Sequence, residues 1–376
     1  MTRLTSVHVE RFRSLREATV KLEPVNVLIG PNGAGKTNLI MFFRLLATAL
    51  DGTLKRFVSR NGGGQCLLYG GAKVSEEIFV HLGFETPKGI GRYNLRLRFA
   101  ADDQLAPERE EPLITDTVEG FARYSGVIAG APVAQFEIAS NAPNALAAQM
   151  PLSNSAQKHV QVFLEGVQAF HFEDTSMEGP LRKRSLLDDT LRLRADGGNL
   201  PAYLLHLRET AHEDYLRIRS TLQLVVPTFE DFILEREGNS ILLRCRMAGH
   251  TDYPIHVSQL SDGTLRLIAL ITLLRQPAGR RPRMMVIDEP ELGLHPAAEA
   301  AVASLIRAAA EEGTQMLVAT QSATFLSHFE PDEVVVVENE AGGSTFRRYS
   351  RNELAGWLER YSLGQIWLKN LIGGRP

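Results

Sequence analysis

The segment Gly30-Pro31-Asn32-Gly33-Ala34-Gly35-Lys36-Thr37 matches the phosphate-binding pattern G-x-x-x-x-G-K-[ST] at every defined position. It lies between a short, β-branched apolar run at Val25–Ile29 and a stretch at Asn38–Leu50 that contains neither Gly nor Pro. The first run predicts a buried parallel strand and the second a helix. A glycine loop between a strand and a helix directs free backbone N–H groups at an anion. This context favours a nucleotide-binding loop over an ordinary glycine-rich turn.

Two side chains at the end of this loop have the chemistry that a nucleoside triphosphate requires. The Lys36 ammonium is placed to reach the β- and γ-phosphates, and the Thr37 hydroxyl is placed to ligate Mg²⁺. The glycines allow the backbone to approach the phosphates closely. The candidate nucleotide-binding residues of this segment are Asn32, Gly33, Ala34, Gly35, Lys36, Thr37 and Asn38.

The composition is that of an ordinary globular protein, with 376 residues, 44% of them hydrophobic and 23% charged. The formal net charge of −3 argues against a protein that coats nucleic acid over its whole surface, and leaves a local basic patch open. Cys66 and Cys245 are isolated, so we expect a buried apolar role for each rather than a metal site. Without a signal peptide or an apolar run of about 18 residues, a cytoplasmic protein with no membrane partner is expected.

A second informative stretch, Met284 to Pro290, reads M-M-V-I-D-E-P and predicts an apolar strand that ends in two carboxylates. Asp288 is placed to hold Mg²⁺ through its water shell, and Glu289 to polarise the attacking water. Gln321 follows a further buried strand at Gln315–Ala319, where it is placed to contact the γ-phosphate or the same water. We therefore interpret Glu289, Lys36 and Gln321 as catalytic, and Thr37 and Asp288 as metal ligands.

The stretch Leu260-Ser261-Asp262-Gly263-Thr264 precedes an apolar run, Leu265–Leu274, which predicts a buried helix. Ser261 and Gly263 then lie at a helix N-terminus, where a hydroxyl, free amides and the positive end of the dipole suit an anion. Taken alone, this pattern is a helix cap. Its place between the phosphate loop and the carboxylate pair favours a second contact to nucleotide.

The chain is expected to form a split core, residues 1–60 and 255–376, interrupted by a β-rich lobe at 61–165 and a helical and β insertion at 166–254. Two stretches, Asp102–Pro112 and Ser140–Asn154, carry no chemical motif and are interpreted as part of the insertion. The expected strands outside the motifs are Leu4–Glu10, Glu17–Leu22, Glu77–Phe84, Tyr93–Ala100, Val167–Phe172, Phe232–Glu235, Ile241–Met247, Ile255–Val257, Val334–Glu338 and Thr345–Tyr349. The expected helices are residues 200–222, a helix after Pro296 that ends at Gly313, and Asn352–Tyr361.

Two further groups of polar residues have a structural and a functional interpretation. Asp174 and Thr175 are more simply the side chains of a turn, although they also suit the Mg²⁺ side of a site. An arginine cluster before the second strand motif is more simply a solvated loop, although it also suits DNA phosphates. That cluster consists of Arg275, Arg280, Arg281 and Arg283.

The order of these motifs resembles the head of ABC-type ATPases, with the closest likeness to the SMC/RecF/OLD-like ATPases and the bacterial group called AAA_21. The resemblance rests on Gly30–Thr37 followed by Asn38, on L-S-D-G-T-L-R from Leu260, and on D-E-P-E-L-G-L-H-P from Asp288 to Pro296. It covers residues 1–60 and 255–376. It implies a P-loop α/β fold with a mixed central sheet flanked by helices, an antiparallel β lobe and a partly helical insertion.

The resemblance also implies ATP and Mg²⁺ as cofactors and a head-to-tail homodimer or higher oligomer. Each nucleotide would lie between Gly30–Thr37 of one copy and Ser261–Gly263 of the other. Arg13 matches the family's arginine near the nucleotide, and His295 is placed at a subunit contact. Two departures stand out, because Gln321 replaces a common His and the family's Mg²⁺-sensing Gln has only the region 168–174 as a counterpart.

Three functional classes follow. The first is an ATP-hydrolysing motor or switch in DNA repair or anti-phage defence, which acts on DNA with a separate nuclease or toxin effector because the 376 residues contain no acidic cluster typical of a nuclease. The second is an ATP-gated scaffold or clamp with slow hydrolysis that holds a partner protein. A transporter head is the third, and the divergent signature and large insertion count against it.

Overall fold

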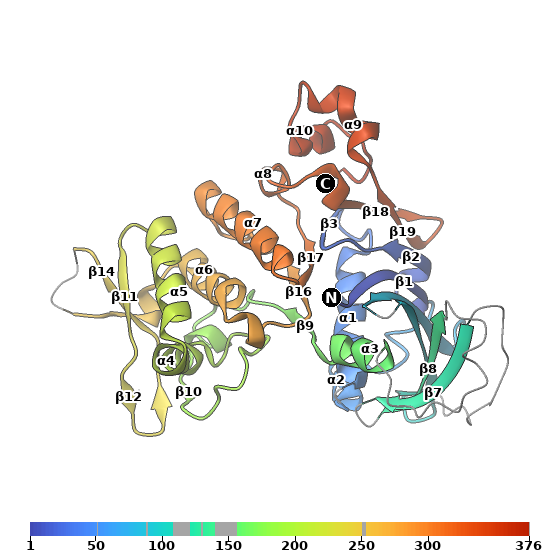
Figure 1. The fold of residues 1–376 in the computed structure, drawn as a ribbon, viewed down its shortest axis with the longest axis horizontal. Helices are drawn as coiled ribbons and strands as arrows, with labels where there is room; N and C mark the ends of the chain where they lie inside the picture. The colour runs from blue at the N-terminus through green and yellow to red at the C-terminus, as the bar shows by residue number, and fades with distance from the viewer. Residues whose placement is uncertain are drawn as a thin grey trace.

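The computed structural model describes residues 1–50, 52–87, 89–107, 121–128, 131–139, 156–249 and 253–375. Two sheets and the helices around them form most of this part of the chain (Figure 1). The α/β class with a mixed central sheet, an antiparallel β lobe and a partly helical insertion is therefore confirmed. The expected stretch Ser140–Asn154 and residues 108–112 lie outside the described residues.

The central sheet has six strands in the order β19-β18-β3-β17-β16-β9. All neighbouring pairs are parallel except β18 with β19. The strands are β3 (Val25–Ile29), β9 (Val167–Phe170), β16 (Met284–Asp288), β17 (Gln315–Ala319), β18 (Val334–Glu340) and β19 (Gly343–Arg348). The residues after β3, β16, β17 and β9 therefore meet at one edge of the sheet, where ligands bind in open α/β sheets.

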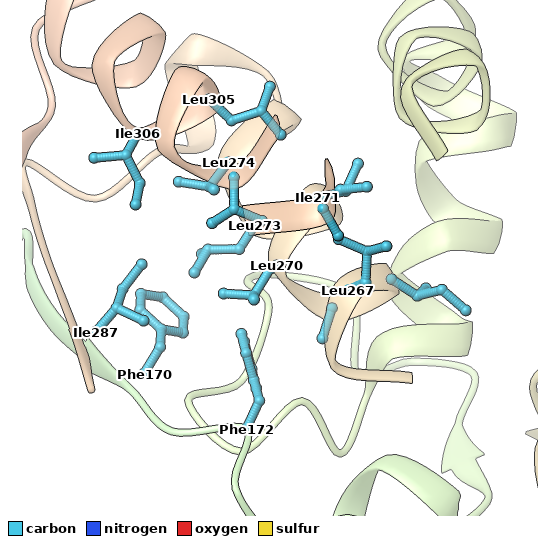
Figure 2. Close-up of a cluster of buried hydrophobic side chains, with 14 of the residues drawn as sticks. Phe170, Phe172, Leu267, Leu270, Ile271, Leu273, Leu274, Ile287, Leu305 and Ile306 are labelled. Atoms are coloured by element: carbon cyan, nitrogen blue, oxygen red, sulfur yellow. The ribbon is translucent and has the colours of Figure 1, made fainter. Parts of the chain in front are cut away.

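Successive side chains of the central strands point to opposite faces, and both faces are buried. Val27 and Ile29 of β3 pack into one apolar core, whereas Leu28 between them packs into the other. Helix α6 (Asp262–Arg275) covers the first face, and Figure 2 shows its Leu270 and Leu273 turned toward Phe170 of β9 and Ile287 of β16. Helix α1 (Lys36–Leu50) covers the other face.

The second sheet is antiparallel and contains seven strands among the described residues, in the order β2-β1-β4-β5-β8-β7 with β6 beside β5. Its strands are β1 (Arg3–Phe12), β2 (Leu15–Lys21), β4 (Glu77–Thr86), β5 (Gly89–Ala100), β6 (Gln104–Pro107), β7 (Phe121–Ile128) and β8 (Ala131–Ala139). β1 pairs with β2 as an N-terminal hairpin, and β4 pairs with β5. Because β1 pairs with β4, the expected domain boundary at residue 60 runs through this sheet.

The remaining helices lie around these sheets and in a separate lobe that contains α4, α5 and α6 (Figure 1). They are α2 (Leu54–Arg60), α3 (Ala156–Glu165), α4 (Leu200–Thr210), α5 (His212–Val225), α7 (Pro296–Glu311), α8 (Ala323–Leu326), α9 (Arg351–Leu358) and α10 (Leu363–Leu368). Short 3₁₀ turns are η2 (Pro180–Arg182), η3 (Val257–Gln259), η4 (Ala278–Arg280) and η5 (Pro331–Glu333). No helix in the described part of the chain has both the length and the hydropathy needed to cross a membrane.

Two expected elements of this lobe are wrong in extent. The helix expected over residues 200–222 is two helices, because the Ala211 backbone (φ −144°, ψ 58°) leaves the helical region and α5 begins anew with Glu213 and Asp214 in its first turn. Carboxylates at that position favour a helix N-terminus. The expected strand at Ile241–Met247 is divided between two small sheets, because Leu242 and Leu243 separate its two ends and are themselves buried in the core.

Those small sheets have the strand orders β10-β13-β12 and β11-β14-β15. Their strands are β10 (Ser185–Leu186), β11 (Phe229–Ile233), β12 (Arg236–Glu237), β13 (Ser240–Ile241), β14 (Arg244–Met247) and β15 (Ile255–His256). Cys245 of β14 is buried as expected, whereas Cys66 is exposed, so the burial expected for Cys66 is wrong. The motif Leu260–Thr264 lies at the start of α6, which packs on the central sheet.

Candidate functional site

The phosphate loop follows β3. Its glycines stand where neighbouring atoms leave no room for a Cβ atom or where the backbone has a positive φ. A Cβ atom on Gly30 would lie 2.1 Å from the Val337 carbonyl oxygen, and one on Gly35 would lie 2.0 Å from the Ser344 hydroxyl. Gly33 has open space around it and a φ of +81°, a conformation that L side chains rarely adopt. Helix α1 starts at Lys36, so its free N–H groups face the loop.

Lys36 lies inside this loop and is 5% exposed. Its Nζ donates to the Gly30 carbonyl at 2.5 Å and to the Pro31 carbonyl at 3.2 Å. Burial lowers the pKa of this ammonium, and the carboxylates of Asp288, Glu289 and Glu291 counteract that shift. The cation is therefore held by backbone oxygens beside three acidic groups, while Asn32 and Thr37 are exposed at the mouth of the loop.

The turn between β1 and β2, which carries Arg13, contacts the phosphate loop and the start of α1 through Ser14. The Ser14 hydroxyl lies 2.7 Å from that of Ser344 and accepts a hydrogen bond from Asn38 Nδ2 at 2.6 Å. The Arg13 backbone has a φ of 48°, and its N–H donates to the Leu67 carbonyl at 2.9 Å. The Arg13 Nε is buried and has no hydrogen-bond partner. The Asn38 amide is thus engaged within the chain, whereas Arg13 retains an unused donor.

Asp288 and Glu289 lie at the carboxyl end of β16, as the sequence predicts. Burial, together with the nearby carboxylates of Glu173 and Glu289, raises the pKa of Asp288 to about 6. The Glu289 backbone has a φ of 43° and its N–H donates to the Ala319 carbonyl of β17 at 2.9 Å. An acid with a raised pKa among like charges is a favourable place for a cation.

Gln321, which was expected to contact the γ-phosphate or the attacking water, contacts the carboxylate of Glu289. Its Nε2 donates to Glu289 Oε1, and its backbone N–H donates to Glu291 Oε1 at 3.1 Å. The same Glu291 oxygen accepts from the Thr320 hydroxyl at 2.5 Å, while Glu291 Oε2 is buried without a partner. Burial raises the pKa of Glu291, which is 8% exposed. Sequence analysis missed Glu291, although its place two residues after the carboxylate pair was a usable signal.

Glu173, and not Asp174, is the acidic group of the β9 loop beside Asp288. The Asp174 carboxylate instead accepts from the Ser176 hydroxyl at 2.6 Å and from the Ser176 N–H at 3.2 Å. These bonds lower the pKa of Asp174, an exposed turn residue, so its interpretation as a turn residue is favoured and the metal-side interpretation is not. Glu173 lines a small cavity with Asp288 and Glu289.

Ser261 caps α6, and its hydroxyl accepts the Thr264 N–H at 3.2 Å. Gly263 is required by a contact inside the chain, because a Cβ atom there would lie 2.1 Å from the Gly293 carbonyl oxygen. His295 is exposed and caps α7, where its Nδ1 accepts the Ala297 N–H at 3.3 Å. The loop that holds Gly293 and His295 therefore packs on the start of α6.

Two arginines that sequence analysis missed hold this second motif in place. Arg182, whose side chain is 7% exposed, donates to the carbonyls of Thr175, Val257 and Leu260 and pairs with Asp262 at 2.7 Å. Arg266 of α6 donates to three further carbonyls, those of Phe172, Glu173 and Leu292. The start of α6 is thereby joined to the loops that follow β9 and β16. Nothing local in the sequence marks Arg182 for this task, whereas Arg266 ends the L-S-D-G-T-L-R stretch and was given no role there.

The predicted site residues thus fall into two groups. The loop Asn32–Asn38, Asp288, Glu289 and Gln321 gather where β3, β16 and β17 end, and the turn that carries Arg13 contacts Asn38 through Ser14. Ser261, Gly263 and His295 gather at the start of α6, and Figure 1 shows α6 and α1 in different lobes. One chain therefore carries two groups of candidate site residues, and Arg266 joins the start of α6 to the loops after β9 and β16.

A protein-family model matches most of the chain. A family model described as "AAA domain, putative AbiEii toxin, Type IV TA system" (AAA_21) matches residues 25–327, which include the predicted site residues except Arg13. The Old nuclease of Escherichia phage P2 is 24% identical over 379 residues, covering 92% of this chain. The chain spans 61% of that relative's length.

Solved structures with the same fold are heads of SMC proteins. An SMC head bound to the C-terminal winged-helix domain of ScpA has a TM-score of 0.59 at 14% identity, covering 94% of this chain and 99% of that one. The SMC head domain with an extended coiled coil from Pyrococcus furiosus has a TM-score of 0.58, also at 14% identity, with coverages of 96% and 99%. At this identity the likeness establishes the fold alone.

Proposed function

The chain belongs to the AAA_21 family and has the fold of an SMC/OLD-like ATPase head, and from that premise we propose that it binds ATP with Mg²⁺ and hydrolyses it. The observation that carries this proposal is the meeting of Lys36, Asp288 and Glu289 beside the phosphate loop. A structural glycine turn would need neither the buried ammonium nor the carboxylates that face it.

In this proposal the loop N–H groups and Lys36 bind the phosphates, and Arg13 contributes its unused Nε donor. The oxygen donors Thr37 and Asp288 suit Mg²⁺, which prefers hard oxygen ligands and keeps several waters. Asp288 fits this task because neighbouring carboxylates crowd it, and a cation would relieve that repulsion. When bound, Mg²⁺ supplies charge stabilisation to the transferring phosphoryl group.

For the hydrolytic step we assign Glu289 as the group that orients and polarises water. Gln321 donates to one oxygen of that carboxylate and leaves the other oxygen to accept from water. Glu291 fixes the loop of Gln321 through the Thr320 hydroxyl and the Gln321 N–H. Glu291 and Gln321 are thus positioning residues that act through Glu289.

We further propose a head-to-tail dimer, in which Ser261–Gly263 of one copy contacts the nucleotide held by the other. Ser261 is exposed at the N-terminus of α6, and Arg182 and Arg266 hold the loops on either side of it. His295 caps the neighbouring helix and is also exposed. The support is that one chain carries two separate candidate anion-binding surfaces, the phosphate loop and the start of α6. A second copy placed head to tail would bring the start of its α6 to the phosphate loop of the first copy.

As a biological role we propose a motor or switch in DNA repair or anti-phage defence that works with a separate nuclease or toxin effector. The support is the likeness to the Old nuclease, of which this chain spans 61%, together with the AAA_21 description. An ATP-gated scaffold with slow hydrolysis is the second candidate. The observation that favours it is Gln321, whose amide cannot exchange a proton with water at neutral pH as a histidine can.

The deciding experiment measures mass and ATP turnover of the purified chain, with and without duplex DNA, for wild type and Glu289→Gln. Glu359→Gln, at an exposed carboxylate that caps the C-terminus of α9, is the matched control. We expect wild type and control to hydrolyse ATP, and Glu289→Gln to bind ATP and accumulate as a dimer. Turnover by Glu289→Gln at the wild-type rate would show that Glu289 is not the water-polarising group.

DNA-stimulated turnover of the wild-type dimer would favour the motor or switch. ATP-dependent assembly with negligible turnover, indifferent to DNA, would favour the scaffold. A chain that neither binds ATP nor changes mass with it would refute both.

A further inference from the structure

A groove runs along the outer edge of β9, the last strand of the central sheet in the described part of the chain. It consists of two adjoining cavities of about 750 and 940 Å³. Both cavities are lined by Glu165, Gln168, Leu191 and Arg192, so they form one continuous depression. Its walls come from α1, α3, the loop at 188–195 and the loop after α6.

The charged side chains of this groove are mainly arginines. The basic residues that line it are Arg44, Arg192, Arg194, Arg280, Arg281 and Arg283, and the acidic residues are Glu165, Asp188 and Asp189. The lining therefore has a formal charge of +3 (six minus three), on a chain whose net charge is −3. Such a local reversal of sign attracts polyanions to one place on the surface.

Several of these arginines have no acidic partner among the described residues. Arg192 and Arg283 are exposed and form no hydrogen bond or ion pair through their side chains there, and the Arg44 Nε is buried without a partner. Arg280 donates to His206 Nε2 at 2.8 Å, so His206 accepts in its neutral form. By contrast, Arg281 pairs with Glu312, and Arg194 pairs with Asp189 and Asp196.

We propose that the groove along β9 binds the phosphate backbone of a nucleic acid strand. This inference rests on the proposed function and deepens it, because it assigns the surface that would contact nucleic acid. Guanidinium groups suit phosphate because their planar donors bind two oxygens at once. The exposed side chain of Leu191, 80% accessible, lies between the two ends of the groove and offers an apolar surface to sugars or bases.

The groove also adjoins the candidate ATP site. Strand β9 lines the groove with Gln168 and leads directly into Phe172 and Glu173, which lie beside Asp288. Arg44 lines the same groove and lowers the pKa of Asp288 by its positive charge, which places it near both. A phosphate bound at Arg44 would therefore alter the field at the carboxylates, so nucleic acid should change ATP turnover.

The test measures binding of a fluorescent oligonucleotide, single-stranded or duplex, to wild type and to Arg192→Gln/Arg283→Gln. Glutamine keeps the stem of Arg283, which packs on Gly166. The matched control is Arg246→Gln/Arg360→Gln, which removes the same charge at exposed positions outside the groove. Titrations between 50 and 300 mM salt, roughly, give the salt slope, and each lost duplex phosphate contact reduces it by about 0.9.

For two lost contacts we expect the salt slope to fall by about 1.8 and duplex affinity to fall about 30-fold near 0.15 M salt, with about 1.4 units of slope for a single strand. The control pair should retain wild-type binding. Equal losses in both pairs would overturn the groove and indicate general charge attraction. Equal competition by polyglutamate of matched charge would overturn the assignment of nucleic acid as the ligand.

ATP binding and basal turnover of the same variants separate this inference from the proposed function. A groove variant that hydrolyses ATP normally but loses stimulation by nucleic acid supports the inference. Wild type that hydrolyses ATP and binds no oligonucleotide refutes the groove and leaves the ATPase proposal standing.

Discussion

Replacing Asp288 with Asn should stabilise the chain in the absence of nucleotide and metal, even though it should abolish Mg²⁺-dependent turnover. The carboxylate is crowded by burial and by Glu173, Glu289 and Glu291, which together raise its pKa from 3.8 to about 6. Asn keeps the size of the side chain and removes the charge. The test therefore asks whether the Asp288 carboxylate, which we assign to cation binding, lowers the stability of the folded chain when no cation is present.

The size and sign of the effect follow from the pKa shift. A carboxyl whose folded-state pKa is raised binds more protons in the folded state than in the unfolded state, so the folded state loses stability as pH rises from 3.8 through 6. The rise in pKa from 3.8 to about 6 lowers the free energy of unfolding of the wild type by about 3 kcal/mol above pH 7, and by roughly half of that at pH 5. Near pH 3.8 the advantage of Asn should largely vanish.

The measurement is urea unfolding of wild type and Asp288→Asn between pH 4 and pH 8 with a chelator present. Asp262→Asn is the control of opposite sign, because its ion pair with Arg182 lowers the pKa of that exposed carboxyl. Asp262→Asn should therefore be less stable than wild type above its carboxyl's pKa. Equal stability of Asp288→Asn and wild type at pH 8 would refute the inference that burial and the neighbouring carboxylates destabilise the ionised Asp288. An advantage unchanged at pH 4 would trace the gain to something other than charge.

Three further substitutions test the site. Lys36→Ala should weaken ATP binding about 100-fold in calorimetry through lost charge-assisted hydrogen bonds, whereas the exposed Lys21→Ala should not. Glu291→Ala should lower the free energy of unfolding by about 2–4 kcal/mol, because it leaves the Thr320 and Gln321 donors unpaired. Glu291→Gln keeps the acceptor and should retain most of that stability. Equal losses in both variants would contradict the assigned contacts. Gly263→Ala should reduce ATP-dependent dimerisation with little change in the nucleotide affinity of the monomer, because the added Cβ atom would collide with the Gly293 carbonyl oxygen. Gly356→Ala is the control, because nothing lies within 4 Å of a Cβ atom added there.

The elements around the nucleotide loop were predictable because their signals are local. The apolar run before Gly30 and the one before Asp288 each encode a buried strand and are followed at once by the residues that the strand positions. The Ser261 cap is equally local, since its acceptor and its Thr264 donor are three residues apart. In these places the motif residues directly adjoin the strand or helix that positions them, so the local sequence pattern is enough to predict the structure.

The rest of the site depends on contacts between distant residues, which no local pattern records. Arg182 binds carbonyls 75 and 78 residues further along the chain. Glu173 is distinguished from Asp174 only by the fold, because the two adjacent acids point to different partners. The break at Ala211 likewise has no Gly or Pro to announce it, and is stabilised by the acids that start α5.

The position of β9 explains why the long segment before it bears on the ATP site. β9 follows the β-rich lobe and α3, yet it pairs in parallel with β16 and forms the edge of the central sheet. One side of this strand is packed under α6 through Phe170, its outer edge lines the arginine groove, and its end leads to Glu173 beside Asp288. A ligand that shifts β9 would therefore move Glu173 relative to the carboxylates of Asp288 and Glu289. Coupling between the groove and ATP turnover then requires no domain motion, only a small displacement of one four-residue strand.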